Sequence, residues 1–215
     1  MSKDDLKTLI CRTAALLRKE GYAAAKGCLS IREGSMIYIT PESVNLSELK
    51  PKDLAEVDLE SGKAVNGKNP AAGLPRHIAV YRNRADINAL IHSTSPSVVC
   101  SSKAGEVIRP LLDDMAQSVG TTLKTAPSGT DSKSLNRLVK ALKGRNSVLL
   151  HEDGALCGSG TMDDAHAICQ VSEKACQAWI ESAILGGGHT INALESALMR
   201  FVYLKKYSRQ AEKNK

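Results

Sequence analysis

Two histidines occupy positions where α/β proteins often place reactive groups. His92 ends the apolar run 89–91, and His151 ends the apolar run 148–150; the ends of strands are common sites of chemistry in such sheets. Zinc sites often use two histidines at i and i+2 of one strand, because alternate side chains share a face. Here the residue two positions after His92 is Thr94. Spacing alone therefore favours a structural strand-end histidine over a metal ligand.

The cysteines and the glycine-rich stretches give weaker evidence of chemistry than the two histidines. The six cysteines form no Cys-x-x-Cys pair, and the chain has no Gly-x-Gly-x-x-Gly, phosphate-loop or Gly-x-Ser-x-Gly motif. The glycines at 186–188 follow a predicted helix and do not open one, which is typical of a helix C-terminus. Cys28 would be a nucleophile only if a cation or a helix terminus lowered its pKa. A small buried thiol is the simpler interpretation.

Helical and strand-like patterns alternate along the chain and must position these groups. Helices are predicted at 2–20, 75–83, 107–120, 134–143, 161–184 and 191–207. Short strands are predicted at 28–32, 36–40, 54–59, 89–92, 121–126, 148–151 and 155–158, with a Ser/Thr/Pro loop after His92. Ser2 with Asp5, and Thr161 with Asp164, form capping boxes. Because no repeat or linker interrupts the pattern, we expect one α/β domain over 1–215.

Composition excludes several classes of protein. The 215 residues are 42% hydrophobic and 24% charged, unlike a disordered or collagen-like chain. Aromatic residues make up only 3%, too few for a set of base-stacking platforms. The net charge of +6 is concentrated in the basic tail 205–215, which has five basic residues and one acid, so we expect no nucleic-acid binding. With no signal peptide and no apolar run of roughly 18 residues, we expect no membrane contact and a cytoplasmic protein with reduced thiols.

Several segments together resemble the class II aldolase/adducin family. Residues 68–73, 75–81 and 89–96 are similar to its central signature. Its early Gly-Asn-x-Ser-x-Arg loop, its Thr-Pro-Ser/Thr-Gly phosphate loop and its late Leu-Leu-x-Asn-His-Gly segment correspond to 25–32, 39–43 and 148–154. Order and spacing agree over roughly residues 5–185. The resemblance implies a three-layer fold, with a central, largely antiparallel sheet flanked by helices, and a homotetramer.

The resemblance also implies that the family's chemical groups are mostly missing. The acid/base Glu position is Gly73, so we expect no catalytic residue there, and the two phosphate-holding serines correspond to Ala71 and Ala72. The three zinc-binding histidines correspond to His92, Thr94 and Asp153, of which only the first is an imidazole. The Asn of the early loop is Cys28, and the last Gly of the phosphate loop is Ser43. We expect these positions to line one cleft: Gly27, Cys28, Thr40, Ser43, Ala71, Ala72, Gly73, His92, Thr94 and Asp153.

We therefore expect a degenerate aldolase-like homo-oligomer without zinc-dependent sugar-phosphate cleavage and without a resident cofactor. Its cleft would bind a small molecule, a phosphorylated sugar or a partner. An alternative is an active carbon–carbon lyase or epimerase-type enzyme on a phosphorylated sugar, in which His92, Asp153 and His151 or Glu152 hold zinc or another divalent metal. A second alternative is a scaffolding protein like the adducin head, with the C-terminal helix and basic tail contacting partners.

Overall fold

A single mixed sheet organises the chain. The computed structural model describes residues 1–23, 27–42 and 44–213, with side chains through 206, so the predicted cleft residue Ser43 lies outside the described residues. The described strands pair in the order β3-β2-β1-β4-β7-β6-β5. All neighbours are antiparallel except β5 and β6, as the resemblance implied. The strands are β1 (Leu29–Glu33), β2 (Met36–Ile39), β3 (Ala55–Asp58), β4 (Ala89–Ser93), β5 (Thr125–Ala126), β6 (Ser147–Leu150) and β7 (Gly154–Ser159).

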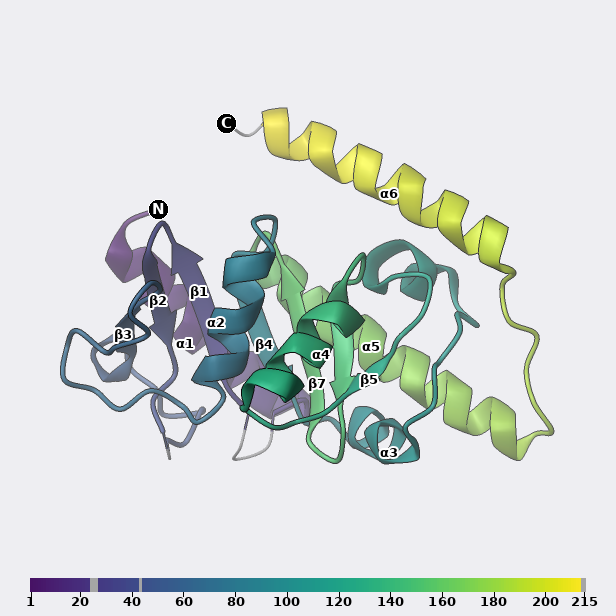
Figure 1. The fold of residues 1–215 in the computed structure, drawn as a ribbon, viewed down its shortest axis with the longest axis horizontal. Helices are drawn as coiled ribbons and strands as arrows, with labels where there is room; N and C mark the ends of the chain where they lie inside the picture. Colours follow the sequence, from purple (N-terminus) through teal and green to yellow (C-terminus); the bar gives the residue numbers. More distant parts are fainter. Residues whose placement is uncertain (24–26, 43, 214–215) are drawn as a thin grey trace.

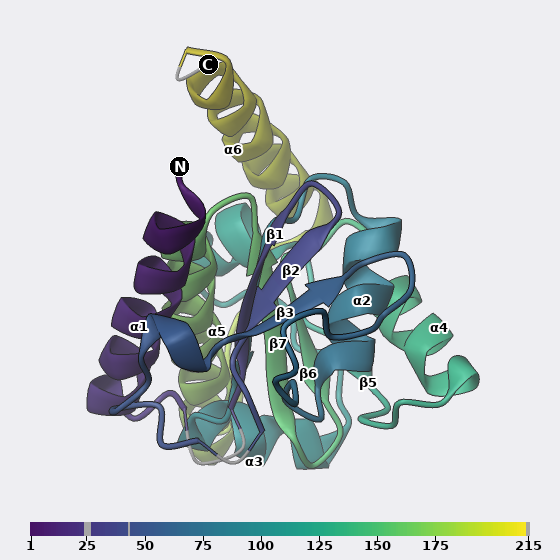
Figure 2. The same cartoon turned by 90° about the vertical axis from the view of Figure 1, so that its left-hand side faces the viewer.

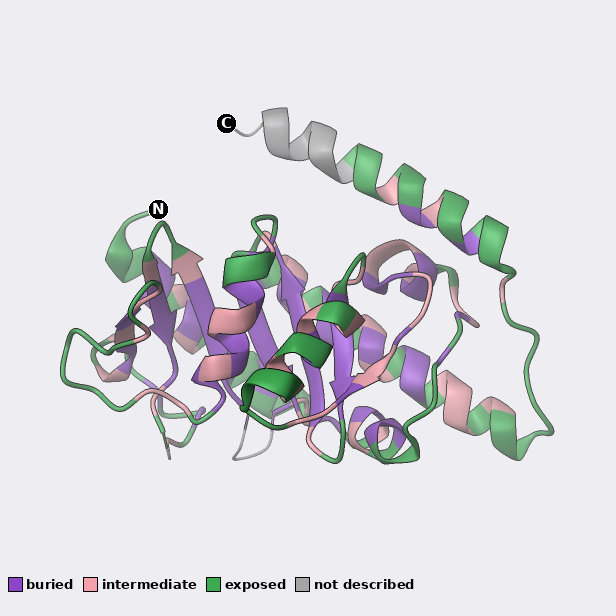
Figure 3. Ribbon diagram, in the orientation of Figure 1, coloured by how far each residue is buried: buried purple, intermediate pink, exposed green. Residues whose placement is uncertain are grey.

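Helices cover both faces of this sheet and make the three layers (Figures 1 and 2). On one face lie α1 (Lys3–Glu20) and α5 (Met162–Ile184), with α3 (Pro96–Ala104) beside α5. On the other face lie α2 (Leu74–Asn83) and α4 (Ser132–Leu142). Apolar side chains alternate along the strands into these two interfaces, so each face of the sheet has its own core, and the central strands are buried throughout (Figure 3).

Local sequence signals explain where the main helices begin. Ser2 and Asp5 form the predicted reciprocal capping box of α1. The side chain of Thr161 accepts a hydrogen bond from the Asp164 N–H and begins α5. The helices predicted at 2–20, 134–143 and 161–184 are all present, within two residues of their expected bounds.

Two sequence predictions were wrong. Residues 107–120 do not form one helix: Ile108 pairs with Leu123 in an isolated bridge, and the helical part is confined to 113–119, of which Met115–Val119 form a π-helix. The segment after His92 is not a loop but contains α3. Its first turn is held by the Glu173 carboxylate of α5, which accepts hydrogen bonds from the Ser95 hydroxyl and the N–H groups of residues 97 and 98 at 2.6–2.9 Å.

The last helix, α6 (Ala193–Lys213), runs above the sheet along the long axis of the molecule (Figure 1) and projects beyond the other elements (Figure 2). Arg200 anchors it by donating to the carbonyls of Gln117 and Ser118 and to the side chain of Asn146. Several of its apolar side chains are exposed: Leu194, Leu198, Phe201, Val202 and Leu204. The homo-oligomer itself stays a prediction. None of the described helices is long and apolar enough to cross a bilayer.

Candidate ligand-binding cavity

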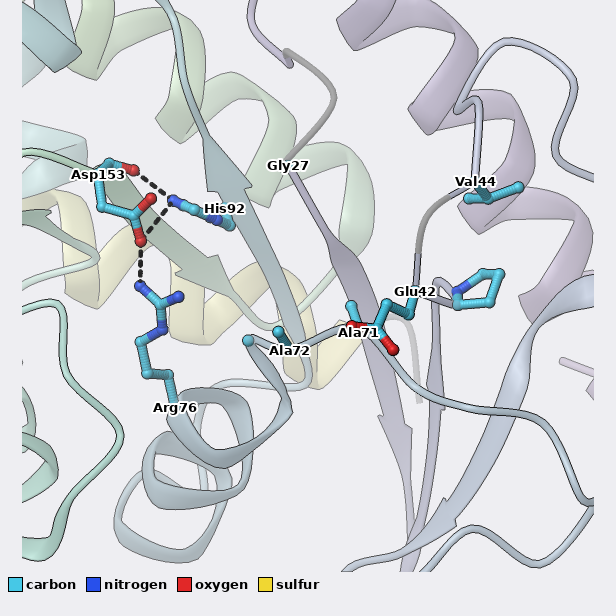
Figure 4. Close-up of a pocket in the computed structure, with 10 residues that line it drawn as sticks. Gly27, Glu42, Val44, Ala71, Ala72, Arg76, His92 and Asp153 are labelled. Carbon is cyan, nitrogen blue, oxygen red and sulfur yellow. Dashed lines mark hydrogen bonds and ion pairs between the residues drawn. The ribbon is translucent and has the colours of Figure 1, made fainter.

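A cavity of about 300 Å³ opens where the start of α2 meets the end of β4 and the turn between β6 and β7. This volume is at the small end for ligand sites. Figure 4 shows Arg76, His92 and Asp153 pointing toward one another at one side, with Glu42 and Val44 at the other. The described residues that line the cavity are Gly27, Pro41, Glu42, Val44, Ala71, Ala72, Gly73, Arg76, His92 and Asp153.

An ion pair and a histidine form the polar side of the cavity. Arg76 Nη1 donates to Asp153 Oδ2 at 2.6 Å, and 10% of the Arg76 side chain is exposed. His92 Nε2 lies 2.5 Å from the Asp153 carbonyl oxygen and 3.7 Å from Asp153 Oδ2. Because a carbonyl only accepts, His92 Nε2 carries a proton and donates it there. The cluster can thus offer guanidinium donors and a carboxylate acceptor to a ligand.

The sheet topology explains why residues 61 positions apart meet. Strands β4 and β7 are neighbours, with His92 opposite Leu156. The turn before β7 folds back so tightly that the backbone at Gly154, with φ of 97°, lies against the carbonyl of Ser93. Asp153 is therefore held directly over the end of β4.

Six of the predicted cleft residues line this cavity, namely Gly27, Ala71, Ala72, Gly73, His92 and Asp153. Cys28, Thr40 and Thr94 are not among the described lining residues. Cys28 lies behind Gly73, and a Cβ built on that glycine would be 2.9 Å from the Cys28 sulfur. Thr40 is buried and accepts a hydrogen bond from the Leu29 N–H, whereas the Thr94 N–H donates to the Tyr22 carbonyl. The Thr40 side chain therefore stabilises the start of β1.

The donor set does not fit a zinc ion. Zinc in proteins takes unprotonated imidazole, thiolate or carboxylate ligands in tetrahedral geometry. Here His92 Nε2 is a hydrogen-bond donor, and the Asp153 carboxylate is already engaged by the Arg76 cation. Over 1–23, 27–42 and 44–206, no three His, Cys, Asp or Glu side chains gather as metal ligands. His151 contacts the Ser102 carbonyl of α3 at 3.3 Å and does not belong to the described lining.

Sequence reasoning missed Arg76 and Glu42 as cavity residues. A basic residue in the first turn of a helix is unfavourable toward the helix dipole, and Arg76 is the third residue of α2. That placement was a signal that the guanidinium has an anionic partner elsewhere. Glu42 lies at the Ser/Thr position of the phosphate-loop resemblance, so a carboxylate there was an available sign against anion binding.

His77 is buried below the cavity, and this burial lowers its pKa to about 3, with His92 and Arg76 acting in the same direction. An unfolded histidine has a pKa of about 6.5. As pH falls below that value the unfolded chain takes up a proton that the folded chain does not. We expect His77 to remove about 1.4 kcal/mol of unfolding free energy per pH unit between about pH 6 and 4.

Urea denaturation of the protein and of His77→Asn across that range measures the effect. The asparagine variant should be less stable near neutral pH but lose less stability per pH unit on acidification. Equal slopes for the two proteins would contradict a neutral buried His77.

The protein-family model for the class II aldolase and adducin N-terminal domain matches residues 8–180. The chain belongs to this family. Among curated class II aldolase relatives, it is 27% identical over 158 residues to a 5-deoxy-D-ribulose 1-phosphate aldolase of Bacillus thuringiensis serovar kurstaki, covering 72% of this chain and 73% of that protein. It is also 27% identical over 173 residues to an L-fuculose phosphate aldolase of Methanococcus vannielii, covering 79% and 92%.

Solved structures agree on the class II aldolase fold. An L-fuculose 1-phosphate aldolase matches with a TM-score of 0.88 at 22% identity, over 94% of this chain and 98% of that one. At this identity the likeness shows the fold alone. The three-layer architecture inferred from sequence motifs is thereby confirmed.

Proposed function

We propose that this class II aldolase family member binds a small molecule in the Arg76–His92–Asp153 cavity and does not catalyse zinc-dependent cleavage of sugar phosphates. One observation carries the proposal: at the positions that the resemblance aligns with metal ligands, His92 donates from Nε2 to the backbone carbonyl of Asp153, and the Asp153 carboxylate is paired with Arg76. The protonated Nε2 of His92 and the Arg76 guanidinium both lie beside the Asp153 carboxylate. This arrangement favours an ordered set of hydrogen-bonding groups over a cation site.

The rest of the cavity supports the same conclusion. Aldol cleavage of a sugar phosphate leaves an enediolate, whose formation needs a proton-transfer group and stabilisation of the negative charge. Gly73 has no side chain to move a proton, and the methyl side chains of Ala71 and Ala72 cannot donate to a phosphate. The described lining has two carboxylates, Glu42 and Asp153, against one guanidinium. This balance favours an uncharged, oxygen-bearing ligand over a phosphate dianion.

The alternative of a re-purposed metal enzyme has weaker support. It relied on His151 or Glu152 joining His92 and Asp153, but His151 is bonded to α3 and neither residue belongs to the described cavity lining. The relatives' names, 5-deoxy-D-ribulose 1-phosphate aldolase and L-fuculose phosphate aldolase, supply the substrates with which to test activity.

The test combines metal content with an aldolase assay. After incubation with zinc and dialysis, we expect the protein to hold far less than one zinc per chain, and to cleave L-fuculose 1-phosphate and 5-deoxy-D-ribulose 1-phosphate no faster than buffer. As a positive control for the metal, the Thr94→His/Asp153→His variant should gain zinc without gaining turnover, because Gly73 still provides no acid or base. Stoichiometric zinc in the unmodified protein, together with cleavage that a chelator abolishes, would overturn the proposal.

A further inference from the structure

The ion pair at the polar side of the cavity leaves hydrogen-bonding groups unused. Among the described residues, Arg76 donates to Asp153 through Nη1 alone, and the Asp153 carboxylate accepts that bond through Oδ2 alone. Arg76 Nη2 and Asp153 Oδ1 therefore have no hydrogen-bond partner in the described part of the chain. The buried side-chain polar atoms that lack a partner there all belong to other residues. Because Arg76 and Asp153 line the cavity, Nη2 and Oδ1 are open to a ligand in it.

The directions of the hydrogen bonds that these two atoms would make are fixed by their chemistry. A guanidinium only donates, and a carboxylate only accepts. Nη2 lies 3.9 Å from the position that a Cβ on Gly73 would take, and Gly73 lines the cavity. Figure 4 shows the Arg76 guanidinium and the Asp153 carboxylate side by side at one end of the cavity. That end therefore offers a ligand one donor and one acceptor on groups that touch each other.

The opposite end of the cavity carries a second acceptor. Glu42 is exposed there, and within the described chain it hydrogen-bonds only through its backbone N–H, to the carbonyl of Asn69. Its carboxylate is thus available to a ligand. Figure 4 places the methyl groups of Ala71 and Ala72 between the two polar ends. A ligand that reaches both ends must therefore be polar at its ends and tolerate apolar contacts between them.

The chemistry of the two ends selects among ligand groups. A phosphate or a carboxylate only accepts hydrogen bonds, and the two carboxylates of the lining would repel it. An ammonium only donates, so it would leave Arg76 Nη2 unpaired. A hydroxyl does both. Adjacent hydroxyl oxygens of a vicinal diol lie about 2.8 Å apart, close to the 2.6 Å between Arg76 Nη1 and Asp153 Oδ2. One hydroxyl of such a pair matches the free donor while its neighbour matches the free acceptor.

We infer that the cavity binds a small neutral polyol or monosaccharide that carries no phosphate. One hydroxyl of a vicinal pair accepts from Arg76 Nη2, its neighbour donates to Asp153 Oδ1, and a hydroxyl farther along the carbon chain donates to Glu42. The cavity volume of about 300 Å³ limits the ligand to a short chain or a single sugar ring. The inference rests on the proposed ligand-binding role of the cavity and names its ligand class.

Four-carbon compounds test this by NMR titration of the ¹⁵N-labelled protein. Erythritol and threitol carry vicinal hydroxyls, 1,4-butanediol has the same carbon chain without them, and erythritol 4-phosphate adds a phosphate. We expect at least one of the two polyols to give saturable shifts of the Ala72 and Gly73 amide signals. The butanediol and the phosphate should each bind at least about tenfold more weakly than that polyol, a difference of about 1.4 kcal/mol.

Variants assign the binding to individual groups. Asp153→Ala removes the acceptor and should weaken polyol binding at least about tenfold. If that variant does not fold, judged by circular dichroism, Ala72→Leu, which fills the cavity from an exposed position, should weaken it likewise. Glu42→Gln should tighten binding of erythritol 4-phosphate at least about threefold without tightening polyol binding. Glu60→Gln is the matched control, because it removes an exposed carboxylate outside the described lining and should change neither affinity.

Several results would overturn the inference. They are the absence of saturable shifts with both polyols, equal or tighter binding of 1,4-butanediol or erythritol 4-phosphate, and unchanged polyol binding in the folded Asp153→Ala or Ala72→Leu variant. Binding of the butanediol or the phosphate in place of the polyols would change the ligand class but keep the cavity as a ligand site. The zinc and aldolase measurements use none of these four compounds, so a failed polyol titration leaves the proposed absence of zinc-dependent cleavage standing.

Discussion

Replacing Gly154 with alanine is expected to lower the free energy of unfolding by about 4 kcal/mol or more. A Cβ at this position would lie 2.1 Å from the Ser93 carbonyl oxygen, and the residue has φ of 97°. The clash is with backbone of the neighbouring strand β4, so no side chain can rotate to relieve it. Because this contact also holds Asp153 over His92, any folded variant should bind ligand poorly. Urea denaturation monitored by circular dichroism gives the stability.

Gly34→Ala is the matched control. Gly34 lies in the turn between β1 and β2 with φ of 58°, and nothing lies within 4 Å of its missing Cβ. It should therefore lose only the conformational cost of alanine in the left-handed region, on the order of 1 kcal/mol. Similar losses for the two variants would show that the turn before β7 is not fixed by its approach to Ser93.

Restoring the family's glutamate in the Gly73→Glu variant is expected to cost about 2–3 kcal/mol and give no turnover. Its Cβ would be 2.9 Å from the Cys28 sulfur, inside van der Waals contact, while the next nearest atoms are 3.9 and 4.0 Å away. Removing the sulfur should therefore relieve the conflict. We expect Gly73→Glu/Cys28→Ala to be more stable than the sum of the single variants predicts, with a coupling of at least about 1 kcal/mol.

Ala72→Glu provides the comparison for charge alone. Ala72 also lines the cavity but is exposed, so the same carboxylate fits there without displacing a buried atom. We expect this variant to lie within about 0.5 kcal/mol of the unmodified protein. Purely additive effects of Gly73→Glu and Cys28→Ala would mean that the two positions do not share one space.

The elements that the sequence predicted well are those with strong local signals. The capping box at Ser2, the helix start at Thr161 and the apolar strands before His92 and His151 needed no distant partner to be recognised, although Thr161 caps its helix without the reciprocal bond from Asp164 to the Thr161 N–H. Helix α3 was missed because its first turn is held by Glu173, 75 or more positions away. The helix predicted over 107–120 contains Pro110, which cannot donate a backbone hydrogen bond. This residue was a sign against one continuous helix there.

The candidate site was predictable as a place but not as a set of interactions. The motif resemblance located His92, Gly73 and Asp153, and the structure places them around one cavity. From the resemblance, Asp153 was only a position where a zinc-binding histidine is missing. The structure shows that its carboxylate is paired with Arg76. That pair joins residues 77 positions apart, and no local periodicity carries such information.

The strand order has a consequence for how the chain acquires its cavity during synthesis. In β4, Ile91 pairs with Leu29, 62 residues earlier, and with Cys157, 66 residues later. Contacts of such high sequence separation form only after long loops have closed, which slows folding. A nascent chain that ends before β7 leaves one edge of β4 unpaired and lacks the turn that carries Asp153. The cavity is thus a late product of translation, completed when the last strand joins the sheet.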